Sequence, residues 1–447
     1  MENLSQKQKI LESPIDKLVW VLSLPAIIAM VLFGLNAFMD TVFIGQLMNQ
    51  RALAGVAIAY PISSILFGLG TWAGTGAANQ LSIALGKDDT KTQTRVLGRM
   101  HGLVILFCIL FVLPIYFSAS LLMTMMGAEG EIHQYGVDYL QHTMMFSPFW
   151  ILALSYNFVI RAEGKMTQAA IMMGSGLILN LILTPIFIAV LDWGVKGAAW
   201  ATNIGMAFYT LLGIFYFHMG KASFPTKLFT IFTDVRQQAA LGFSAFIMTI
   251  MGLVQAAVVF NVIADHGNDD DLAFFAAANR ILMFLMTPLF GLMRAYQPVA
   301  GINFGAQQYD RVISSFWVFC RAGCLIVIPV WIVLTLFPEA ALNIVLPDNT
   351  LSKQDLINFQ VYVVVLPFLP FVFMSLTLLP AIEEPKFANI LGLARQLVFY
   401  VPAMLLLPIW FGLSGVYFGS TVIDVFLTFC LLAIVMSSFK RMKSQHS

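Results

Sequence analysis

Long apolar runs separated by short polar segments fill most of this 447-residue chain. A helix needs about 20 mostly apolar residues to cross a bilayer. Twelve such runs are present, and several are longer than a bilayer requires, which predicts tilted or bent helices. The runs cover residues 17–46, 53–83, 96–126, 137–161, 168–190, 195–218, 238–264, 272–302, 312–337, 357–382, 387–410 and 413–438.

Lys and Arg are distributed unevenly over the segments around these runs. With the N-terminus inside, 17 of them, Arg161 included, fall in inner segments, and only Arg51, Lys196 and Lys353 fall in outer ones. Basic residues are enriched on the cytoplasmic side of membrane proteins. We therefore expect a multi-pass protein of the cell (plasma or inner) membrane with both termini in the cytoplasm.

The two halves of the chain resemble each other. RALAGVAIAYPI at 51–62 aligns with DDLAFFAAANRI at 270–281 at an offset of 219, and Gly194 and Gly197 align with Gly412 and Gly415 at an offset of 218. Parallel repeats of this kind are a common transporter plan. The pattern predicts an all-α integral membrane protein in which twelve transmembrane helices form two six-helix lobes related by an internal pseudo-two-fold repeat.

The predicted boundaries follow from this repeat. We expect an N-terminal lobe at 1–219 (helices 1–6), a cytoplasmic linker at 220–237 and a C-terminal lobe at 238–447 (helices 7–12). Within the linker, TKLFTIFTDVRQ at 226–237 is either a short interfacial helix or an ordinary loop.

Composition supports the membrane assignment and narrows the function. The chain is 59% hydrophobic and 11% charged, whereas soluble domains are about 45–50% apolar and about 25% charged. A net charge of +1 gives no reason to expect nucleic acid. The four cysteines lack metal-site spacing, and no nucleophile–base set or phosphate loop is present. We expect no enzyme activity, no metal and no cofactor, with an ion gradient as the source of energy.

Asp40 is an acidic residue inside the first apolar run. A charge deep in a membrane helix costs at least ~2.5–3.5 kcal/mol, so it usually has a partner, a cavity or a function. Asn36 shares its helix face at i, i+4, and Pro25 predicts a kink earlier in the helix. The alternative is a partly solvated Asp40 near the outer helix end. In the repeat, the position in the second half that is equivalent to Asp40 is Val259, so we expect ion chemistry in the N-terminal lobe.

The chain resembles the multidrug and toxic compound extrusion (MATE) family. The resemblance rests on the six-plus-six arrangement, on Pro25 followed by NAFMDTVFIG at 36–45, on QLSIALGK at 80–87, and on NLILTPIFI at 180–188 followed by GVKGAAWAT at 194–202. The absence of acids from helices seven and eight is similar to the DNA-damage-inducible (DinF-like) branch.

This resemblance implies a site. The family's helix-one acid falls on Asp40, a helix-four tyrosine on Tyr139, the helix-five asparagine on Asn180 and a helix-six threonine on Thr202. Thr184 stands where many relatives have a second acid, and it shares a face with Asn180 at i, i+4. We expect Asn36 and these four neutral side chains to line a substrate or coupling cavity around Asp40. The alternatives are plain helix–helix hydrogen bonds for Asn180 and Thr184, and an interfacial anchor for Tyr139.

A lone carboxylate can hold a proton or pair with a lipophilic cation, so the two compete. We therefore expect a secondary active multidrug exporter that exchanges lipophilic or cationic drugs and dyes for protons at Asp40, as a monomer in membrane lipid. A sodium-coupled antiporter and a lipid-linked precursor flippase of related fold are the alternatives; the flippase would favour several basic residues around the central cavity. Arg294 and Arg395 either pair with Asp424 or reach that cavity.

Labelling of introduced cysteines tests the orientation. In a variant without its native cysteines, Arg51→Cys and Lys353→Cys should react with a membrane-impermeant maleimide added to intact cells. Lys91→Cys and Lys440→Cys should react only after the membrane is opened. Labelling of Lys91→Cys from outside would overturn the predicted orientation.

Overall fold

The computed structural model describes residues 5–226, 235–343, 345–346 and 351–444. Residues 227–234, which make up most of the segment for which an interfacial helix was considered, lie outside this description. Helices and no strands are found in the described part of the chain.

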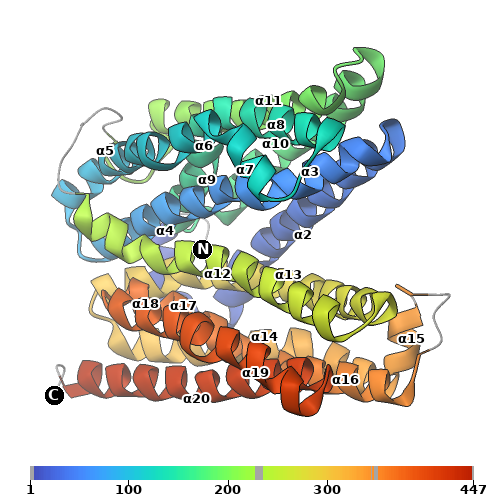
Figure 1. Cartoon of the computed structure of the whole chain (residues 1–447). Helices are drawn as coiled ribbons and strands as arrows, with labels where there is room; N and C mark the ends of the chain where they lie inside the picture. Colours follow the sequence, from blue (N-terminus) through green and yellow to red (C-terminus); the bar gives the residue numbers. More distant parts are fainter. Residues whose placement is uncertain (1–4, 227–234, 344, 347–350, 445–447) are drawn as a thin grey trace.

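The first half of the chain builds the upper group of helices in Figure 1. Two π-helical turns, η1 (Cys108–Val112) and η2 (Ile186–Val190), interrupt or extend its helices. The helices are α1 (Gln6–Glu12), α2 (Ile15–Leu47), α3 (Gln50–Ser63), α4 (Ile65–Gly86), α5 (Thr90–Phe107), α6 (Leu113–Phe117), α7 (Ala119–Met125), α8 (Gly130–Met145), α9 (Ser147–Ala162), α10 (Met166–Pro185) and α11 (Gly194–His218).

The second half builds the lower group (Figure 1). It includes a 3₁₀ turn, η3 (Leu366–Phe368), and a π-helical segment, η4 (Ala394–Tyr400). The helices are α12 (Arg236–His266), α13 (Asp269–Gly305), α14 (Tyr309–Leu336), α15 (Pro338–Asn343), α16 (Lys353–Val363), α17 (Leu369–Ala381), α18 (Pro385–Leu393), α19 (Val401–Phe411) and α20 (Ser414–Ser444).

The predicted membrane helices are present. In the described residues, 11 helical stretches are long and apolar enough to cross a bilayer, and a twelfth is obtained if α8 and α9 form one span bent by 57°. The predicted all-α, two-lobe membrane fold is confirmed. The lobe and linker boundaries stay a prediction.

Backbone geometry displays the internal repeat. Asp88 and Gln307, with φ of 55° and 59°, are 219 residues apart, as are Gly164 and Glu383, with φ of 79° and 63°. Gly194 and Gly412, 218 residues apart, have φ of 55° and 58°. Positive φ is uncommon for residues other than glycine. Its recurrence at a nearly constant offset shows that the two lobes form the same turns between their helices.

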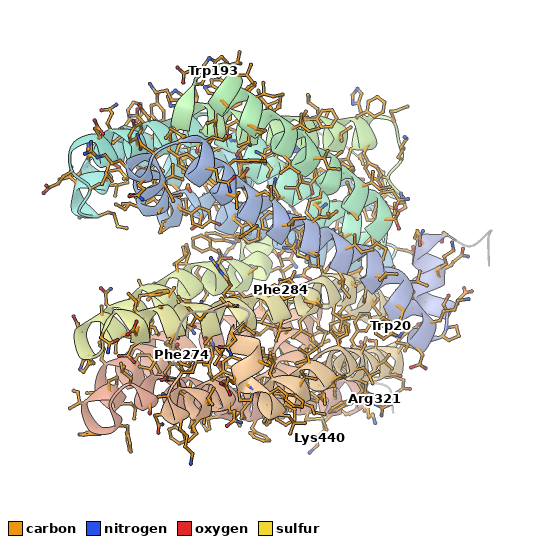
Figure 2. The ribbon with its side chains drawn as sticks, turned by 90° about the vertical axis from the view of Figure 1, so that its right-hand side faces the viewer. Trp20, Trp193, Phe274, Phe284, Arg321 and Lys440 are labelled. Atoms are coloured by element: carbon orange, nitrogen blue, oxygen red, sulfur yellow. The ribbon has the colours of Figure 1, made fainter. Side chains whose placement is uncertain are left out.

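Glycines let helices of opposite lobes approach backbone to backbone. A Cβ at Gly86 would lie 2.3 Å from the Ile302 carbonyl oxygen, and one at Gly305 would lie 2.2 Å from the Ile83 carbonyl oxygen. Both contacts join the end of α4 to the end of α13. Figure 2 shows the two groups of helices together near Trp20 and separating toward the end at which Phe274 lies.

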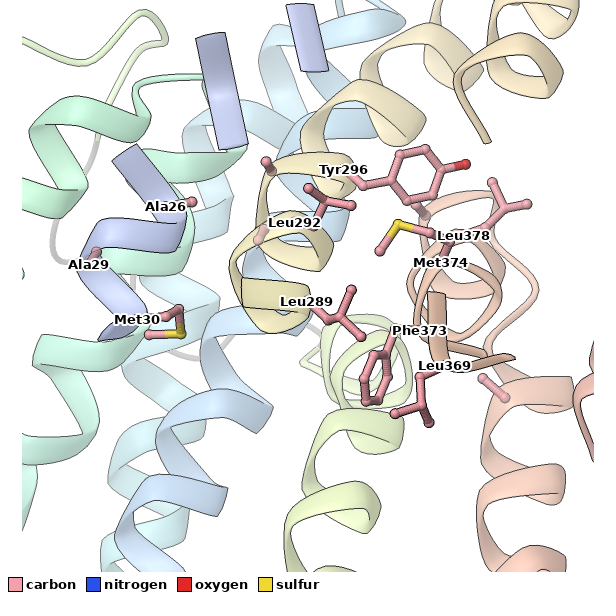
Figure 3. Packing of buried hydrophobic residues seen from close by; sticks show 14 of the residues in the cluster. Ala26, Ala29, Met30, Leu289, Leu292, Tyr296, Leu369, Phe373, Met374 and Leu378 are labelled. Atoms are coloured by element: carbon pink, nitrogen blue, oxygen red, sulfur yellow. The ribbon is translucent and has the colours of Figure 1, made fainter. Parts of the chain in front are cut away.

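The core continues from α2 across α13 into the second lobe. Leu289, Leu292 and Tyr296 of α13 are fully buried and point toward α17 in Figure 3. On its other side, α13 packs against α2, where a Cβ at Gly291 would lie 2.6 Å from the Ile27 Cα. α13 therefore ties the lobes together through both α2 and α4. A second contact joins α12 to α4, where a Cβ at Gly242 would lie 2.0 Å from the Trp72 carbonyl oxygen.

Adding a methyl group at the α4–α13 contact should destabilise the protein. Gly305→Ala places a Cβ against backbone that cannot move aside, and overpacking of this kind typically costs about 1–3 kcal/mol. Gly252→Ala is the matched control, because nothing lies within 4 Å of a Cβ there. Thermal unfolding in detergent should show a lower Tm for Gly305→Ala only. Equal Tm values for the two variants would contradict the close contact.

Candidate functional site

Helical spacing brings the polar side chains of the first lobe together at one place. Asn36 and Asp40 lie one turn apart on α2, and Asn180 and Thr184 lie one turn apart on α10. α11 approaches α10 closely, because a Cβ at Gly205 would lie 2.7 Å from the Gly176 carbonyl oxygen. This approach brings Thr202 of α11 into the same group.

Hydrogen bonds connect the members of this group, which we call the Asp40 cluster (Asn36, Asp40, Asn180, Thr184 and Thr202). The Thr184 hydroxyl lies 3.3 Å from Asp40 Oδ1 and 2.9 Å from the Asn180 carbonyl oxygen. It has one proton and donates to one of them at a time. Asn180 and Thr184 are 2% and 1% exposed, so these contacts lie inside the lobe.

The Asn180 amide has two orientations with suitable partners, because its oxygen and nitrogen are nearly isosteric. In one, its oxygen accepts from Asn36 Nδ2 at 2.7 Å and its nitrogen faces the Thr202 hydroxyl at 3.1 Å. In the other, its nitrogen donates to Asp40 Oδ1 at 3.2 Å and its oxygen accepts from the hydroxyl and backbone amide of Thr202. The Asn36 amide then has to turn as well, so that its oxygen and not its nitrogen lies 2.7 Å from the Asn180 nitrogen. The second orientation suits an ionised Asp40, since a carboxylate only accepts hydrogen bonds.

Two tyrosines complete the surroundings of Asp40. Tyr139 of α8 packs beside Ile44 and Val56 and lies within electrostatic range of Asp40. Tyr60 of α3, to which no sequence motif pointed, also lies within that range. Its one visible signal was a phenol in the apolar run AIAYPI, at the position that Asn279 takes in the second repeat.

Asp40 has no cationic partner in the described part of the chain. The corresponding region of the second lobe is different. There, Arg395 Nε lies 2.7 Å from Asp424 Oδ1, and Arg395 also faces Gln255, the repeat counterpart of Asn36. The acid of the second lobe is therefore neutralised within the fold, whereas Asp40 is held by neutral groups.

A cavity of about 420 Å³ lies between the lobes. Its walls come from α2, α4, α9, α12, α13 and α17. They are mainly apolar, and no Asp or Glu is among the lining residues. The lining includes Met30, Phe33, Gly34, Phe67, Thr71, Asn79, Phe158, Arg161, Met248, Phe290, Met293, Arg294 and Gln297.

The structure also places the remaining candidates. α2 continues as one helix through Pro25, so the predicted kink stays a prediction. Arg395 pairs with Asp424, while Arg294 reaches the central cavity. Arg161, which the charge count places in an inner segment, lies in the last turn of α9, but it is 2% exposed and lines the cavity, so it adds no exposed charge at that helix end. The charge asymmetry keeps its direction without it.

The comparisons with known proteins agree over nearly the whole chain. The family model described as MatE matches residues 25–186 and 240–405. The multidrug export protein MepA of Staphylococcus haemolyticus (strain JCSC1435) is 26% identical over 447 residues, covering 96% of this chain and 95% of that protein. MepA of Staphylococcus aureus (strain NCTC 8325 / PS 47) is 26% identical over 432 residues, covering 95% and 94%.

Solved structures show the same fold. A MATE structure in the bent conformation matches with a TM-score of 0.89 at 21% identity, covering 98% of both chains. The outward-facing conformation of a multidrug resistance MATE family transporter matches with a TM-score of 0.88 at 21% identity, covering 97% of this chain and 98% of that one. The predicted resemblance to the MATE family is confirmed. Its narrower form, a resemblance to the DNA-damage-inducible branch, stays a prediction.

The different surroundings of the two acids predict different effects on stability. Asp424→Asn leaves Arg395 without its partner and should lower stability by an amount between the ~1 kcal/mol of an exposed pair and the ~3–5 kcal/mol of a buried one. Asp40→Asn removes a charge that has no cationic partner, so stability should be unchanged or higher. Thermal unfolding of both purified variants checks this, and a Tm for Asp40→Asn as low as that of Asp424→Asn would mean that Asp40 has a structural partner.

Proposed function

The chain belongs to the MatE family of multidrug and toxic compound extrusion transporters, and from that premise we propose that it exports lipophilic, cationic organic compounds in exchange for protons. Members of this family are transporters and not enzymes. In this proposal Asp40 is the group for which proton and compound compete. The Asp40 cluster contributes to xenobiotic efflux, and hence to antibiotic resistance, through this competition.

The observation that carries the proposal is the set of partners around Asp40. Thr184, Asn180 and the nearby tyrosines are neutral, so the charge state of the site depends on Asp40 itself. Asn180 and Thr184 can donate to the ionised carboxylate, and their oxygens can accept from the protonated acid. The cluster therefore has hydrogen-bonding partners for both states of the acid, which an exchanger requires.

The Asp40 cluster and the central cavity share helix α2. Met30, Phe33 and Gly34 line the cavity, and Asp40 lies six residues beyond Gly34, about 9 Å along the helix at 1.5 Å per residue. A compound in the cavity meets Asp40 directly if it extends along α2. Otherwise a change in the charge of Asp40 acts on the cavity through a movement of α2, which can bend at Pro25.

Topology and assembly belong to the same proposal. We place the chain in the cell (plasma or inner) membrane as a monomer, with both termini cytoplasmic. The close α4–α13 contact then lies on the cytoplasmic side, so the structure corresponds to a state open to the outside.

Specific observations also support two alternative functions, sodium coupling and the transport of a lipid-linked precursor. The oxygens of Asp40, Asn180, Thr184 and Thr202 lie near one another, as a sodium site would require, although the described residues contain no group of three or more His, Cys, Asp or Glu side chains. A lipid-linked precursor flippase would require basic residues at the cavity, and Arg161 and Arg294 are there.

Dye binding at varied pH tests the proton assignment. Because protonation removes the negative charge of Asp40, binding of a cationic dye to purified protein should weaken as pH falls, by up to ~10-fold per pH unit for one competing proton. By the same linkage, dye binding should release protons into weak buffer. Asp40→Asn should abolish both effects.

The control and the sodium arm use the same assay. Asp424→Asn should keep the pH dependence and the proton release, provided that the variant folds. Sodium at constant pH and ionic strength should have little effect. If millimolar sodium displaced the dye while protons did not, sodium coupling would replace the proton assignment.

A further inference from the structure

Two arginines from opposite lobes face the central cavity. Arg161 comes from the last turn of α9 and Arg294 from the middle of α13. The Arg294 guanidinium lies 4.7 Å from the centre of the Phe158 ring, a cation–π contact. The two positive charges are close enough to repel one another, and the cavity lining contains no carboxylate to offset them.

Arg161 has an unusual environment for a buried charge. It is 2% exposed, yet its Nε, Nη1 and Nη2 atoms form no hydrogen bond to any residue that the structure describes. Guanidinium stays protonated in proteins and carries five N–H donors. A buried, unpaired charge is costly, so such a group in a native fold calls for an explanation.

The neighbouring acid does not serve as its partner. Glu163, two residues further on, instead accepts from the Tyr216 hydroxyl at 3.0 Å and pairs with Lys165 at 3.2 Å. Two arginines elsewhere in the fold show the usual arrangement: Arg395 pairs with Asp424, and Arg311 donates to the carbonyl oxygens of Ile10 and Ser13. Arg161 and Arg294 instead line the cavity, and the Arg161 nitrogens are buried in its wall without an acceptor among the described residues.

We propose that Arg161 and Arg294 form an anion subsite that binds the carboxylate, sulfonate or phosphate group of an amphipathic organic compound in the central cavity. The guanidinium fork matches the geometry of such groups and forms charge-assisted hydrogen bonds with them. The apolar part of the compound lies against the aromatic wall of Phe33, Phe67 and Phe290. The proposal rests on the export function and narrows its substrates to those cationic compounds that also carry an acidic group.

The size of the cavity favours a soluble compound over a lipid. Drug-sized ligands occupy pockets of about 300–1,000 Å³, and about 420 Å³ falls in that range. The charge also fits, because a cleft with one sign of charge and low-dielectric walls concentrates ions of the opposite sign.

Two probes with the same apolar body separate the anionic group from simple hydrophobic binding. Dansylglycine carries a carboxylate, and dansylglycinamide has a neutral amide in its place. Binding of each to the full-length protein, in nanodiscs of neutral phosphatidylcholine, can be followed by energy transfer from tryptophan. Dansylglycine should bind the wild type at least about 10-fold more tightly, as expected for hydrogen bonds to a charged group.

Arginine variants should remove this preference. Arg161→Gln and Arg294→Gln should each weaken dansylglycine binding by about 10-fold or more and leave dansylglycinamide binding nearly unchanged. Arg321→Gln, which removes an exposed arginine of α14, is the matched control and should keep the preference. Removal of an unpaired buried charge should not lower Tm, so Arg161→Gln should remain folded; Arg294→Gln tests the subsite separately.

The test of the anion subsite does not depend on whether Asp40 exchanges protons. The assay runs at constant pH without a gradient, and Asp40→Asn should keep its preference for dansylglycine whether or not Asp40 couples transport. Equal affinity of the wild type for the two probes, or an unchanged preference in both folded arginine variants, would overturn the anion subsite. If phosphatidylglycerol in the nanodisc displaced dansylglycine in an Arg161-dependent way, the subsite would belong to a lipid headgroup and not to a soluble compound.

Discussion

A carboxylate held inside a membrane lobe by neutral hydrogen-bond donors is the constraint on which the proposed exchange depends. Because no cation lies beside Asp40, the fold does not hold this carboxyl group in its ionised form. In the proposed exchange, the proton or the cationic compound that arrives therefore decides its charge. An arginine in contact with Asp40, as Arg395 is with Asp424, would keep the carboxyl group ionised. The lobes share one architecture, but only the first leaves its acid free to change.

Helix packing connects the surroundings of Asp40 with the central cavity and with the contact between the lobes. α2 carries Asp40 near one end, lines the cavity with Phe33 and Gly34 near its middle, and packs against Gly291 of α13 further along. Close backbone contacts between α4 and α13 leave little room for small adjustments on that side. A shift of α2 would therefore alter the cavity and the lobe contact together, which would link the proposed coupling site to the opening between the lobes.

Much of this organisation could be predicted, because helix spacing and membrane cost act locally. The i, i+4 pairs Asn36–Asp40 and Asn180–Thr184 do meet as expected, and the family resemblance identified Thr202 beside them. The direction of a buried side chain is harder to predict. Arg161 does lie at the end of α9 beside Glu163 and Lys165, but nothing in the sequence indicates that its side chain is buried and lines the cavity. Tyr60 gave no clear signal, since a tyrosine in an apolar run usually indicates an interface.

Infrared difference spectroscopy of purified protein with ¹³C-labelled aspartate tests the central claim most directly, because it reports the protonation state of Asp40 itself. We expect a carbonyl band of a protonated carboxylic acid that shifts with the label, disappears when a cationic dye binds and is absent from Asp40→Asn. The band should remain in Asp424→Asn. If the acid band were missing at every pH at which dye binding responds, or stayed unchanged when dye binds, Asp40 would not be the site at which proton and compound compete.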